Sequence, residues 1–377
     1  MLKVDVNSSG SFMTLKTNKG SFRFHAIWLR DNALDESTRD PTNGQRLITL
    51  QDIPKDIRLI SAVFGDNEIL CTFSAENKTF RYPLSWLLNH AYDNRQQRDR
   101  IKLEPERIPW DKNLEKKVPK CEISELESNS KSLQKWLFDV HRYGFAKVNG
   151  LSGIPGEIFR IVDLFGYVRE TNYGRHFEVR TEVNPVNLAY TGLALQAHTD
   201  NPYRDPVPTL QILSCVENST EGGDSMVIDG HKIAMDIFAE DPEGFSCLTS
   251  FPARFSYDGS KEVSLKTKKP IIELSLDNEI TCVRFNSRST SPLVDVPFNS
   301  MEKYYAAYRR FAELVDERKN QVAFKLKPGE AFIVDNTRVL HSRKEYSGAG
   351  KRWLQGCYAD KDSLLSKLRS LEYLNVK

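Results

Sequence analysis

Residues 328–343 have the sequence PGEAFIVDNTRVLHSR, in which the order of residue types predicts two strands joined by a loop. Pro328-Gly329 favours a turn, and the apolar run Ala331–Val334 that follows favours a buried strand. The polar residues after this run favour a loop that delivers His341 to the beginning of another strand. His341 is therefore a candidate metal ligand.

Two further candidate ligands lie upstream, where residues 195–200 read LQAHTD. His198 and Asp200 are two residues apart, and residues i and i+2 of an extended chain point to the same face, so both can reach one metal ion. Alone this pair is weak evidence, because a histidine at a strand end can simply bond a nearby carboxylate. With His341 the set becomes two histidines and one carboxylate.

Such a set is typical of a non-haem Fe(II) oxygenase. Three ligands on one face of an octahedral iron leave three positions open, which a bidentate oxoacid and dioxygen both need. A structural zinc site requires four protein ligands, and no fourth is evident. A zinc hydrolase is disfavoured because the sequence lacks a recognisable general base such as the Glu of H-E-x-x-H.

Arg352 follows His341 by eleven residues (352 − 341). We expect the strand after His341 to run out, turn at 348–350 and return, which brings Arg352 alongside the metal. A guanidinium there can hold the distal carboxylate of a dicarboxylic cosubstrate in a bidentate pair. The alternative is a surface arginine on a barrel rim, but the two metal-binding segments favour the cosubstrate interpretation.

Short strands dominate the rest of the second part of the chain. We predict them at 209–216, 226–229, 271–274, 280–285, 331–334 and 354–358. Helical spacing predicts helices at Gly230–Ala239 and Ser300–Lys319, and a helix over 133–141 that ends near Gly144 and leads directly into a strand. Many short strands with a few covering helices predict a mostly β fold of the α+β class, with a double-stranded β-helix (jelly-roll) core.

The first 100 residues predict a small β-rich domain. Its expected strands are 22–28, 47–50, 59–63, 69–73 and 79–82, followed by a short helix at 85–94. Residues 101–124 are charged and interrupted by prolines, so we predict a linker there. The predicted domains are therefore 1–100, N-terminal, and 125–377, catalytic.

The composition is that of an ordinary globular protein. Of 377 residues, 40% are hydrophobic and 28% charged, and the net charge of +2 disfavours nucleic acid or a membrane surface as partner. Residues 1–12 lack the apolar run of a signal peptide, and no long apolar stretch occurs, so we expect a cytoplasmic protein. The six cysteines are scattered without a C-x-x-C pair, which favours reduced thiols.

Several ordered blocks extend this pattern over nearly the whole chain: WLRDN at 28–32, NLAYT at 187–191, HTD at 198–200, LQILSC at 210–215, GGDS at 222–225, DG at 229–230, and the segment 335–341. In these blocks the chain closely resembles the γ-butyrobetaine hydroxylase group of 2-oxoglutarate oxygenases. The resemblance implies a jelly-roll core, a small N-terminal domain and a homodimer. It also implies Fe(II), O2 and 2-oxoglutarate as cosubstrate, with ascorbate as a helpful additive.

The resemblance implies roles for individual residues. His198, Asp200 and His341 would hold the iron and Arg352 would anchor 2-oxoglutarate, while Leu213 and Asn187 would line the cosubstrate site. One departure concerns the N-terminal domain, where the group usually carries three cysteines after the WLRDN block and a later histidine that together bind zinc. Here residues 33–38 read ALDEST and the later position is Lys78, so we expect the domain to fold without zinc.

Relatives that act on trimethylammonium compounds hold the cation in an aromatic cage. A quaternary ammonium has no hydrogen to donate, so cation–π attraction and apolar contact are the means left to recognise it. By alignment the cage positions fall on Tyr173, Phe177, Tyr190 and Tyr358. Any one of these aromatic residues can be core packing, but together they match the pattern of the group.

The residues expected around the anionic end of the substrate differ from those of the carnitine-forming relatives. Asn187 and Asn286 are equivalent to the asparagines that face the substrate carboxylate there, but Arg288 replaces a small residue and Asn201 replaces what can be an aromatic one. An added guanidinium and amide suit a headgroup with more oxygens and charge, such as a phosphonate. The alternative is that Arg288 faces solvent or pairs with an acid.

The resulting hypothesis is hydroxylation of 2-(trimethylamino)ethylphosphonate at the carbon bonded to phosphorus. That carbon is the second from nitrogen, as is the carbon oxidised in γ-butyrobetaine. A cage that fixes the ammonium group can therefore place the second carbon of either substrate next to the iron. γ-Butyrobetaine hydroxylation that forms carnitine is the alternative activity. A non-catalytic jelly-roll protein that only binds a betaine is the alternative of another class, which Arg352 argues against because a pure binder needs no oxoacid site.

Overall fold

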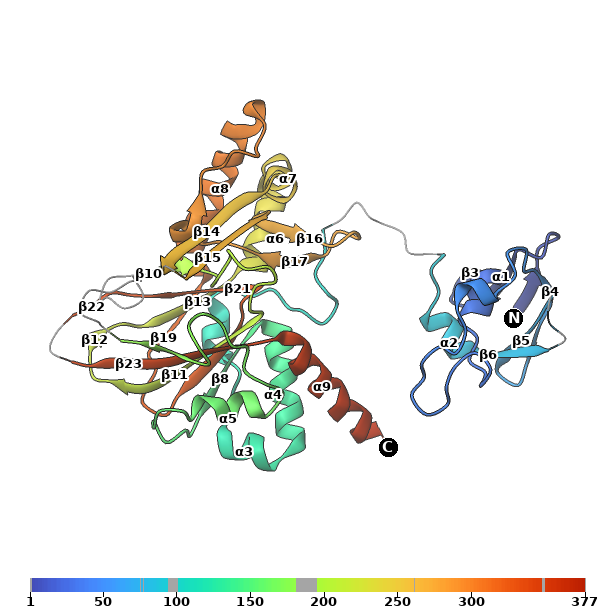
Figure 1. Ribbon diagram of the computed structural model, residues 1–377, viewed down its shortest axis with the longest axis horizontal. Helices are drawn as coiled ribbons and strands as arrows, with labels where there is room; N and C mark the ends of the chain where they lie inside the picture. The colour runs from blue at the N-terminus through green and yellow to red at the C-terminus, as the bar shows by residue number, and fades with distance from the viewer. Residues whose placement is uncertain are drawn as a thin grey trace. The chain divides into compact units, whose positions relative to one another are not determined.

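The computed structural model describes residues 2–74, 76, 78–93, 101–180, 195–260, 262–347 and 350–376. The chain divides into two compact units, Met1–Gln97 and Arg98–Lys377, each with its own hydrophobic core. Figure 1 shows both, with the first in blue. Within the described residues no helix has the length and apolar character needed to cross a bilayer.

The first unit contains two three-stranded antiparallel sheets around a core of residues such as Met13, Phe24 and Phe73. Its elements are β1 (Lys3–Val6), β2 (Phe12–Thr17), β3 (Gly20–His25), α1 (Ala26–Asp31), the 3-10 turn η1 (Leu50–Asp52), β4 (Leu59–Gly65), β5 (Glu68–Phe73), β6 (Thr79–Pro83) and α2 (Leu84–Asn89). The strands predicted at 59–63, 69–73 and 79–82 and the helix that follows them are confirmed.

One strand prediction in this unit is too long and another is wrong. The strand predicted at 22–28 ends at His25, because α1 begins at Ala26 and turns Leu29 into the core. The strand predicted at 47–50 is absent, and Thr49 and Asp52 instead cap η1 reciprocally through backbone and side-chain hydrogen bonds. Apolar residues at 47–50 misled the prediction, since Leu47 and Leu50 are both exposed.

The second unit is built on two sheets that face each other. The larger, in the order β7-β8-β20-β11-β23-β9, consists of β7 (Lys120–Glu122), β8 (Phe145–Asn149), β20 (Ala331–Asp335), β11 (Leu210–Asn218), β23 (Arg352–Ala359) and β9 (Phe177–Val179). The smaller, in the order β10-β21-β13-β19, consists of β10 (Leu195–His198), β21 (Val339–Arg343), β13 (Ser225–Asp229) and β19 (Gln321–Phe324). Phe145, Val227, Phe332 and Leu354 pack in one core drawn from both sheets. The predicted jelly-roll core is confirmed.

Helices cover the outer face of the larger sheet (Figure 1). They are α3 (Ile123–Ser128), α4 (Ser130–Tyr143), α5 (Ile158–Asp163) and α9 (Lys361–Val376). The predicted passage from helix to strand is confirmed: α4 ends at Tyr143, Gly144 caps it with a left-handed φ of 69°, and β8 begins at the next residue. A Cβ at Gly144 would lie 2.9 Å from a Val339 methyl, so close packing also requires glycine there.

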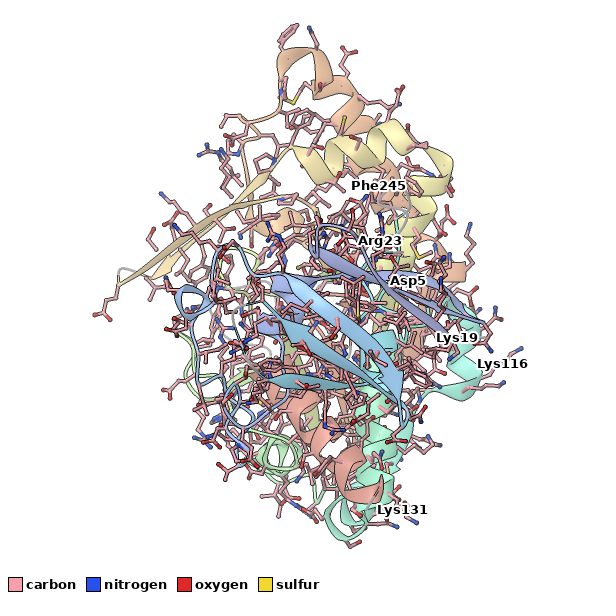
Figure 2. All side chains as sticks on the ribbon, turned by 90° about the vertical axis from the view of Figure 1, so that its right-hand side faces the viewer. Asp5, Lys19, Arg23, Lys116, Lys131 and Phe245 are labelled. Atoms are coloured by element: carbon pink, nitrogen blue, oxygen red, sulfur yellow. The ribbon has the colours of Figure 1, made fainter. Side chains whose placement is uncertain are left out.

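A second group of elements forms another core beside the smaller sheet. It comprises α6 (Gly230–Glu240), α7 (Pro242–Ser250), β14 (Ala253–Ser260), β15 (Val263–Lys269), β16 (Ile272–Leu274), β17 (Ile280–Val283), β18 (Thr290–Ser291) and α8 (Met301–Asp316). The predicted helices Gly230–Ala239 and Ser300–Lys319 are confirmed as α6 and α8, although α8 ends earlier. Phe245 of α7 lies in this core. Lys116 and Lys131, which belong to other parts of this unit, are exposed (Figure 2).

Residues 101–124, predicted as a linker, are part of the second unit. The segment contains η2 (Lys112–Lys117) and β7, and β7 pairs in parallel with β8. Trp110 is 6% exposed, and its backbone N–H donates to the Asp229 carboxylate over 3.1 Å. The prolines and charges that suggested a linker thus surround apolar residues that the catalytic unit buries.

Candidate active site

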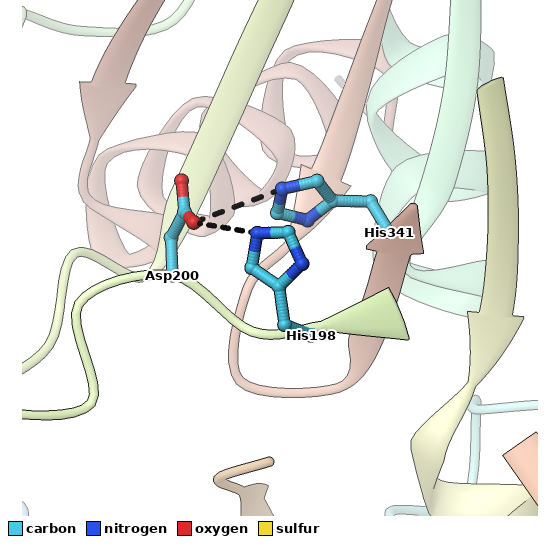
Figure 3. A group of neighbouring side chains, drawn as sticks. All are labelled: His198, Asp200 and His341. Atoms are coloured by element: carbon cyan, nitrogen blue, oxygen red, sulfur yellow. Dashed lines mark ion pairs between the residues drawn. The ribbon is translucent and has the colours of Figure 1, made fainter. Parts of the chain in front are cut away.

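Strand pairing brings the three predicted metal ligands together. β10 and β21 are antiparallel, and their register sets His198 directly opposite His341. Asp200 follows β10 by two residues, and its Oδ1 lies 3.3 Å from His198 Nε2 and 3.7 Å from His341 Nε2 (Figure 3). The three ligand atoms lie within 4.8 Å of one another, and in the described parts of the chain no second such group occurs.

Surrounding residues orient the carboxylate of Asp200. Its backbone N–H donates to Asn336 Oδ1 over 2.7 Å, and Asn336 Nδ2 donates back to the Asp200 carbonyl over 2.9 Å. Gln211 Nε2 and the Tyr358 hydroxyl both donate to Oδ2, over 2.5 and 2.7 Å. Oδ1 is therefore the oxygen that faces the two histidines.

The protonation states suit a metal ion. Burial, with His198 and Arg288 nearby, lowers the pKa of His341 to about 3 despite Asp200, so this imidazole is neutral at pH 7. Burial alone would raise the pKa of Asp200, but His341 and His198 lower it below its usual range. His198 Nδ1 lies 2.7 Å from the Gln196 carbonyl, so Nδ1 carries the proton and Nε2 is left to bind metal. Two imidazoles and one carboxylate fit Fe(II) with open positions.

The triad lines a cavity of about 430 Å³. Leu213 of β11 and Arg352 of β23 line the same cavity and are 8% and 6% exposed. Arg343, which we did not predict, lines it too and is 4% exposed. Its position two residues after His341 on one strand was the available signal, because such residues share a face. Two buried guanidinium groups suit a dicarboxylate such as 2-oxoglutarate.

Aromatic side chains form another wall of this cavity. The rings of Phe177 and Tyr358 are 5.1 Å apart and those of Tyr173 and Phe177 are 6.2 Å apart. Tyr203 and Tyr257, not predicted, extend the wall with rings stacked at 5.0 Å. Tyr190, the remaining cage candidate, lies outside the described residues, as does Asn187.

Three polar residues predicted to bind substrate line the cavity as well. Asn201 and Asn286 are each 4% exposed, while Arg288 is exposed in the short turn η4 (Ser287–Ser289). Arg288 is near enough to lower the pKa of His341. The structure thus gathers metal ligands, arginines, aromatic rings and amides around one cavity.

Known proteins match this arrangement. The Taurine catabolism dioxygenase TauD, TfdA family matches residues 110–358, about two thirds of the chain. The chain belongs to the TauD, TfdA family. It is 30% identical over 350 residues to the "Gamma-butyrobetaine dioxygenase" of Pseudomonas sp. (strain AK-1), covering 93% of this chain and 90% of that protein.

A second relative and a solved structure also match the chain. The chain is 28% identical over 383 residues to the "Trimethyllysine dioxygenase" of Meyerozyma guilliermondii, covering 98% of this chain and 95% of that protein. The solved structure of an asparagine oxygenase with Fe(II), hydroxyasparagine and succinate superposes with a TM-score of 0.50 at 15% identity. It covers 63% of this chain and 83% of that one, and it supports the fold.

This TauD, TfdA chain is an Fe(II)/2-oxoglutarate-dependent dioxygenase of the type found in γ-butyrobetaine and trimethyllysine dioxygenases. When bound, iron and 2-oxoglutarate supply the activation of O2 and the hydroxylation of an unactivated carbon. The protein itself would supply three metal ligands, bind the cosubstrate and orient the substrate. No side chain in the cavity is needed as a general acid or base.

Proposed function

We propose that this enzyme hydroxylates a small trimethylammonium zwitterion, and that the preferred substrate is 2-(trimethylamino)ethylphosphonate, oxidised at the carbon bonded to phosphorus. The observation that carries the proposal is a single cavity in which Arg288 and two buried asparagines share space with tyrosine rings and the metal triad. An aromatic wall suits the cation, and a guanidinium with two amides suits a phosphonate.

The aromatic wall supports the cationic half of this proposal. Tyr173, Phe177, Tyr203, Tyr257 and Tyr358 all line the cavity, and a trimethylammonium group can bind such a wall by cation–π attraction without a hydrogen-bond donor. Tyr358 links this wall to the metal, because its hydroxyl donates to Asp200. A cation held against the Tyr358 ring is therefore held at a set distance from the iron, which determines the carbon that is oxidised.

Arg288 supports the anionic half. It stands at the mouth of the cavity and acts electrostatically on His341, so a headgroup bound to it lies next to the metal. A phosphonate offers three oxygens, whereas a carboxylate offers two. The guanidinium fork can pair with two phosphonate oxygens and leave the third for the amides.

Succinate formation tests the function. The iron-loaded enzyme would be supplied with 2-oxoglutarate, O2 and ascorbate, and with the phosphonate, γ-butyrobetaine or trimethyllysine in parallel. We expect the strongest stimulation with the phosphonate, with 31P NMR showing a new hydroxyl on the carbon attached to phosphorus. Stimulation only by γ-butyrobetaine would support the alternative activity, carnitine formation. Tight binding of a betaine without succinate would support a binding protein.

Arg288→Ala and Arg288→Lys give a sharper test. Loss of a charge-assisted pair should raise KM for the phosphonate by about 10- to 100-fold, while lysine restores charge but not the fork and should recover only part. KM for γ-butyrobetaine should change much less. Arg254→Ala is the matched control, since this arginine pairs with Asp295 at the surface of β14. Equal loss with both substrates would contradict the phosphonate assignment.

We also propose that the enzyme is a homodimer, as the resemblance of its sequence blocks implies. Light scattering of the purified protein at several concentrations tests this directly. A mass of two chains, each of 43.2 kDa, is expected.

A further inference from the structure

Two buried amides in the cavity each leave one polar atom without a hydrogen-bond partner among the described residues. These atoms are Asn201 Nδ2, a donor, and Asn286 Oδ1, an acceptor. Both side chains are 4% exposed and both line the cavity that holds the metal triad. A buried polar atom without a partner is costly, so each of these two atoms indicates a place for a ligand atom.

The orientation of Asn286 is determined by the main chain. Its Nδ2 donates to the carbonyl of Thr199 over 3.1 Å, and a carbonyl can only accept. Nδ2 must therefore face Thr199, and Oδ1 must lie on the other side of the amide. Thr199 lies between two metal ligands along the chain, and its N–H donates to the Phe285 carbonyl over 2.8 Å, so the position of this amide is firmly set.

The orientation of Asn201 is determined by Tyr203. The Tyr203 hydroxyl donates to Asn201 Oδ1 over 2.7 Å and lies 2.9 Å from the hydroxyl of Tyr173. Tyr173 then donates to Tyr203, so the chain of hydroxyls runs from the aromatic wall toward the amide. Asn201 has a φ of 53°, a conformation that asparagine tolerates better than most residues, and this places its amide beside Asp200.

We propose that Tyr203 and the Thr199 carbonyl hold these two amides in opposite senses, so that the cavity selects a headgroup that both accepts and donates a hydrogen bond. This inference rests on the proposed function. For the phosphonate, the matching form is the singly protonated monoanion: one oxygen accepts from Asn201 Nδ2 and the P–O–H donates to Asn286 Oδ1. A dianion would set a bare anionic oxygen against Asn286 Oδ1. Tyr203 is thus a positioning residue that acts through Asn201.

The direct test is the pH dependence of phosphonate binding. Kd would be measured by calorimetry on the complex with iron and 2-oxoglutarate, with O2 excluded, across the second ionisation of the phosphonate. Because only the monoanion fits, Kd should rise by about tenfold per pH unit above that ionisation. γ-Butyrobetaine is the reference ligand, since its carboxylate does not titrate in this range.

The reference profile also corrects for ionisation of the protein. Charged and titratable groups around the cavity include Asp258 and Tyr257 on β14, Arg288 on η4, Arg343 on β21 and Arg352 on β23, besides the metal ligands and the tyrosines already named. Any effect that they have on binding appears with both ligands. A phosphonate profile parallel to that of γ-butyrobetaine would overturn the inference.

A sulfonate analogue distinguishes the effect of the negative charge from that of the proton that the phosphonate donates. 2-(Trimethylamino)ethylsulfonate carries one negative charge and three oxygens but no proton to donate, so we expect it to bind about tenfold more weakly than the phosphonate monoanion. Equal affinity would overturn the inference and leave the proposed function intact. Absence of phosphonate binding at every pH would instead overturn the proposed function.

Two variants test the separate roles of Tyr203 and Asn286. Tyr203→Phe keeps the ring but frees the Asn201 amide, so we expect Kd for the phosphonate to rise about tenfold while the slope with pH is kept. Asn286→Leu removes the acceptor, so the slope with pH should disappear. Tyr305→Phe is the control, because this tyrosine of α8 is 51% exposed and does not line the cavity, so it should keep the preference for phosphonate over sulfonate. Loss of that preference in Tyr305→Phe but not in Asn286→Leu would overturn the assignment. The charge-transfer absorption of the iron complex verifies folding of each variant.

Discussion

At the scale of single residues, the metal site depends on how the two oxygens of Asp200 are used. Gln211 and Tyr358 donate to Oδ2, which leaves Oδ1 for the metal ion. Mutation of groups that orient a ligand in this way typically lowers metal affinity by about 10- to 100-fold. Gln211 also stands opposite Tyr358 in the register of β11 and β23, so both donors come from one strand pair.

Replacing Gln211 should therefore weaken metal binding. For Gln211→Leu we expect Kd for Fe(II), or for Co(II) as a redox-stable substitute, to rise by about 10- to 100-fold. Titration of the metal-free protein measures it. Gln355→Leu is the matched control, because Gln355 is a buried glutamine of β23 that bonds Glu178 and Gly156 instead of Asp200. An unchanged Kd in Gln211→Leu would contradict this role.

Lys78 forms an ion pair with Asp35 in the first unit. Burial would raise the pKa of Asp35, but hydrogen bonds from Lys78, Ser37 and Thr38 lower it well below its usual range. Lys78 also lies over the Phe80 ring at 5.3 Å. This loop is therefore held by charge and hydrogen bonds at the positions where relatives are expected to hold zinc.

The pH dependence of stability tests this pairing. A carboxyl group with a lowered folded pKa stabilises the fold above its unfolded pKa and loses that contribution as pH falls through the folded pKa. For Lys78→Met, we expect the acid midpoint of unfolding to move to higher pH and the neutral stability to fall by about 0.5–1 kcal/mol, since the lysine is half exposed. Lys3→Met is the control, as its pair with Asp5 is more exposed. Equal acid midpoints would contradict the role.

At the scale of elements, the substrate wall depends on how closely β9 approaches β23. Gly356 of β23 pairs with Phe177 of β9, and a Cβ on this glycine would lie 2.3 Å from the Phe177 ring. It would also lie 2.9 Å from Leu213 on β11. The absence of a side chain at Gly356 thus leaves room for the Phe177 ring at the cavity.

Gly356→Ala should displace the Phe177 ring from the aromatic wall. We expect KM for the trimethylammonium substrate to rise at least about tenfold, with the KM for 2-oxoglutarate rising less, because Arg352 is unaffected. Steady-state kinetics with each substrate varied in turn measures both. Combining the change with Phe177→Leu should relieve part of the clash. A selective loss of 2-oxoglutarate affinity would contradict this account.

At the scale of the whole molecule, the described residues form two units with separate cores, and the metal triad belongs to the second. The expectation that the first unit needs no zinc then has a clear consequence. Metal removal should act on the catalytic unit, because a bound ion stabilises the part of the chain that binds it.

Hydrogen exchange measures this effect unit by unit. After treatment with a chelator we expect amides of β10 and β21 to exchange faster and those of β5 and β6 to keep their protection. Elemental analysis of the untreated protein should show iron at about one per chain and no stoichiometric zinc. Loss of protection in β5 and β6 would show that the first unit holds a structural metal.

Local patterns indicated the metal ligands. Spacing along an extended chain sets His198 and Asp200 on one face, and the turn, apolar strand and polar loop at 328–341 indicated His341. The helix that ends at Gly144 and the apolar strand at 331–334 were predictable for the same reason.

Other features depended on which distant segments meet. Gln211, Tyr203 and Tyr257 come from elements whose partners lie far away in the sequence, so no local pattern marks them as parts of one cavity. Residues 101–124 resemble a linker in sequence, and only the pairing of β7 with β8 shows that they belong to a sheet. The sequence alone therefore determined the chemistry of the metal centre, through short-range spacing. Only the tertiary structure decided the shape and polarity of the cavity around it, because strand register and long-range packing create both.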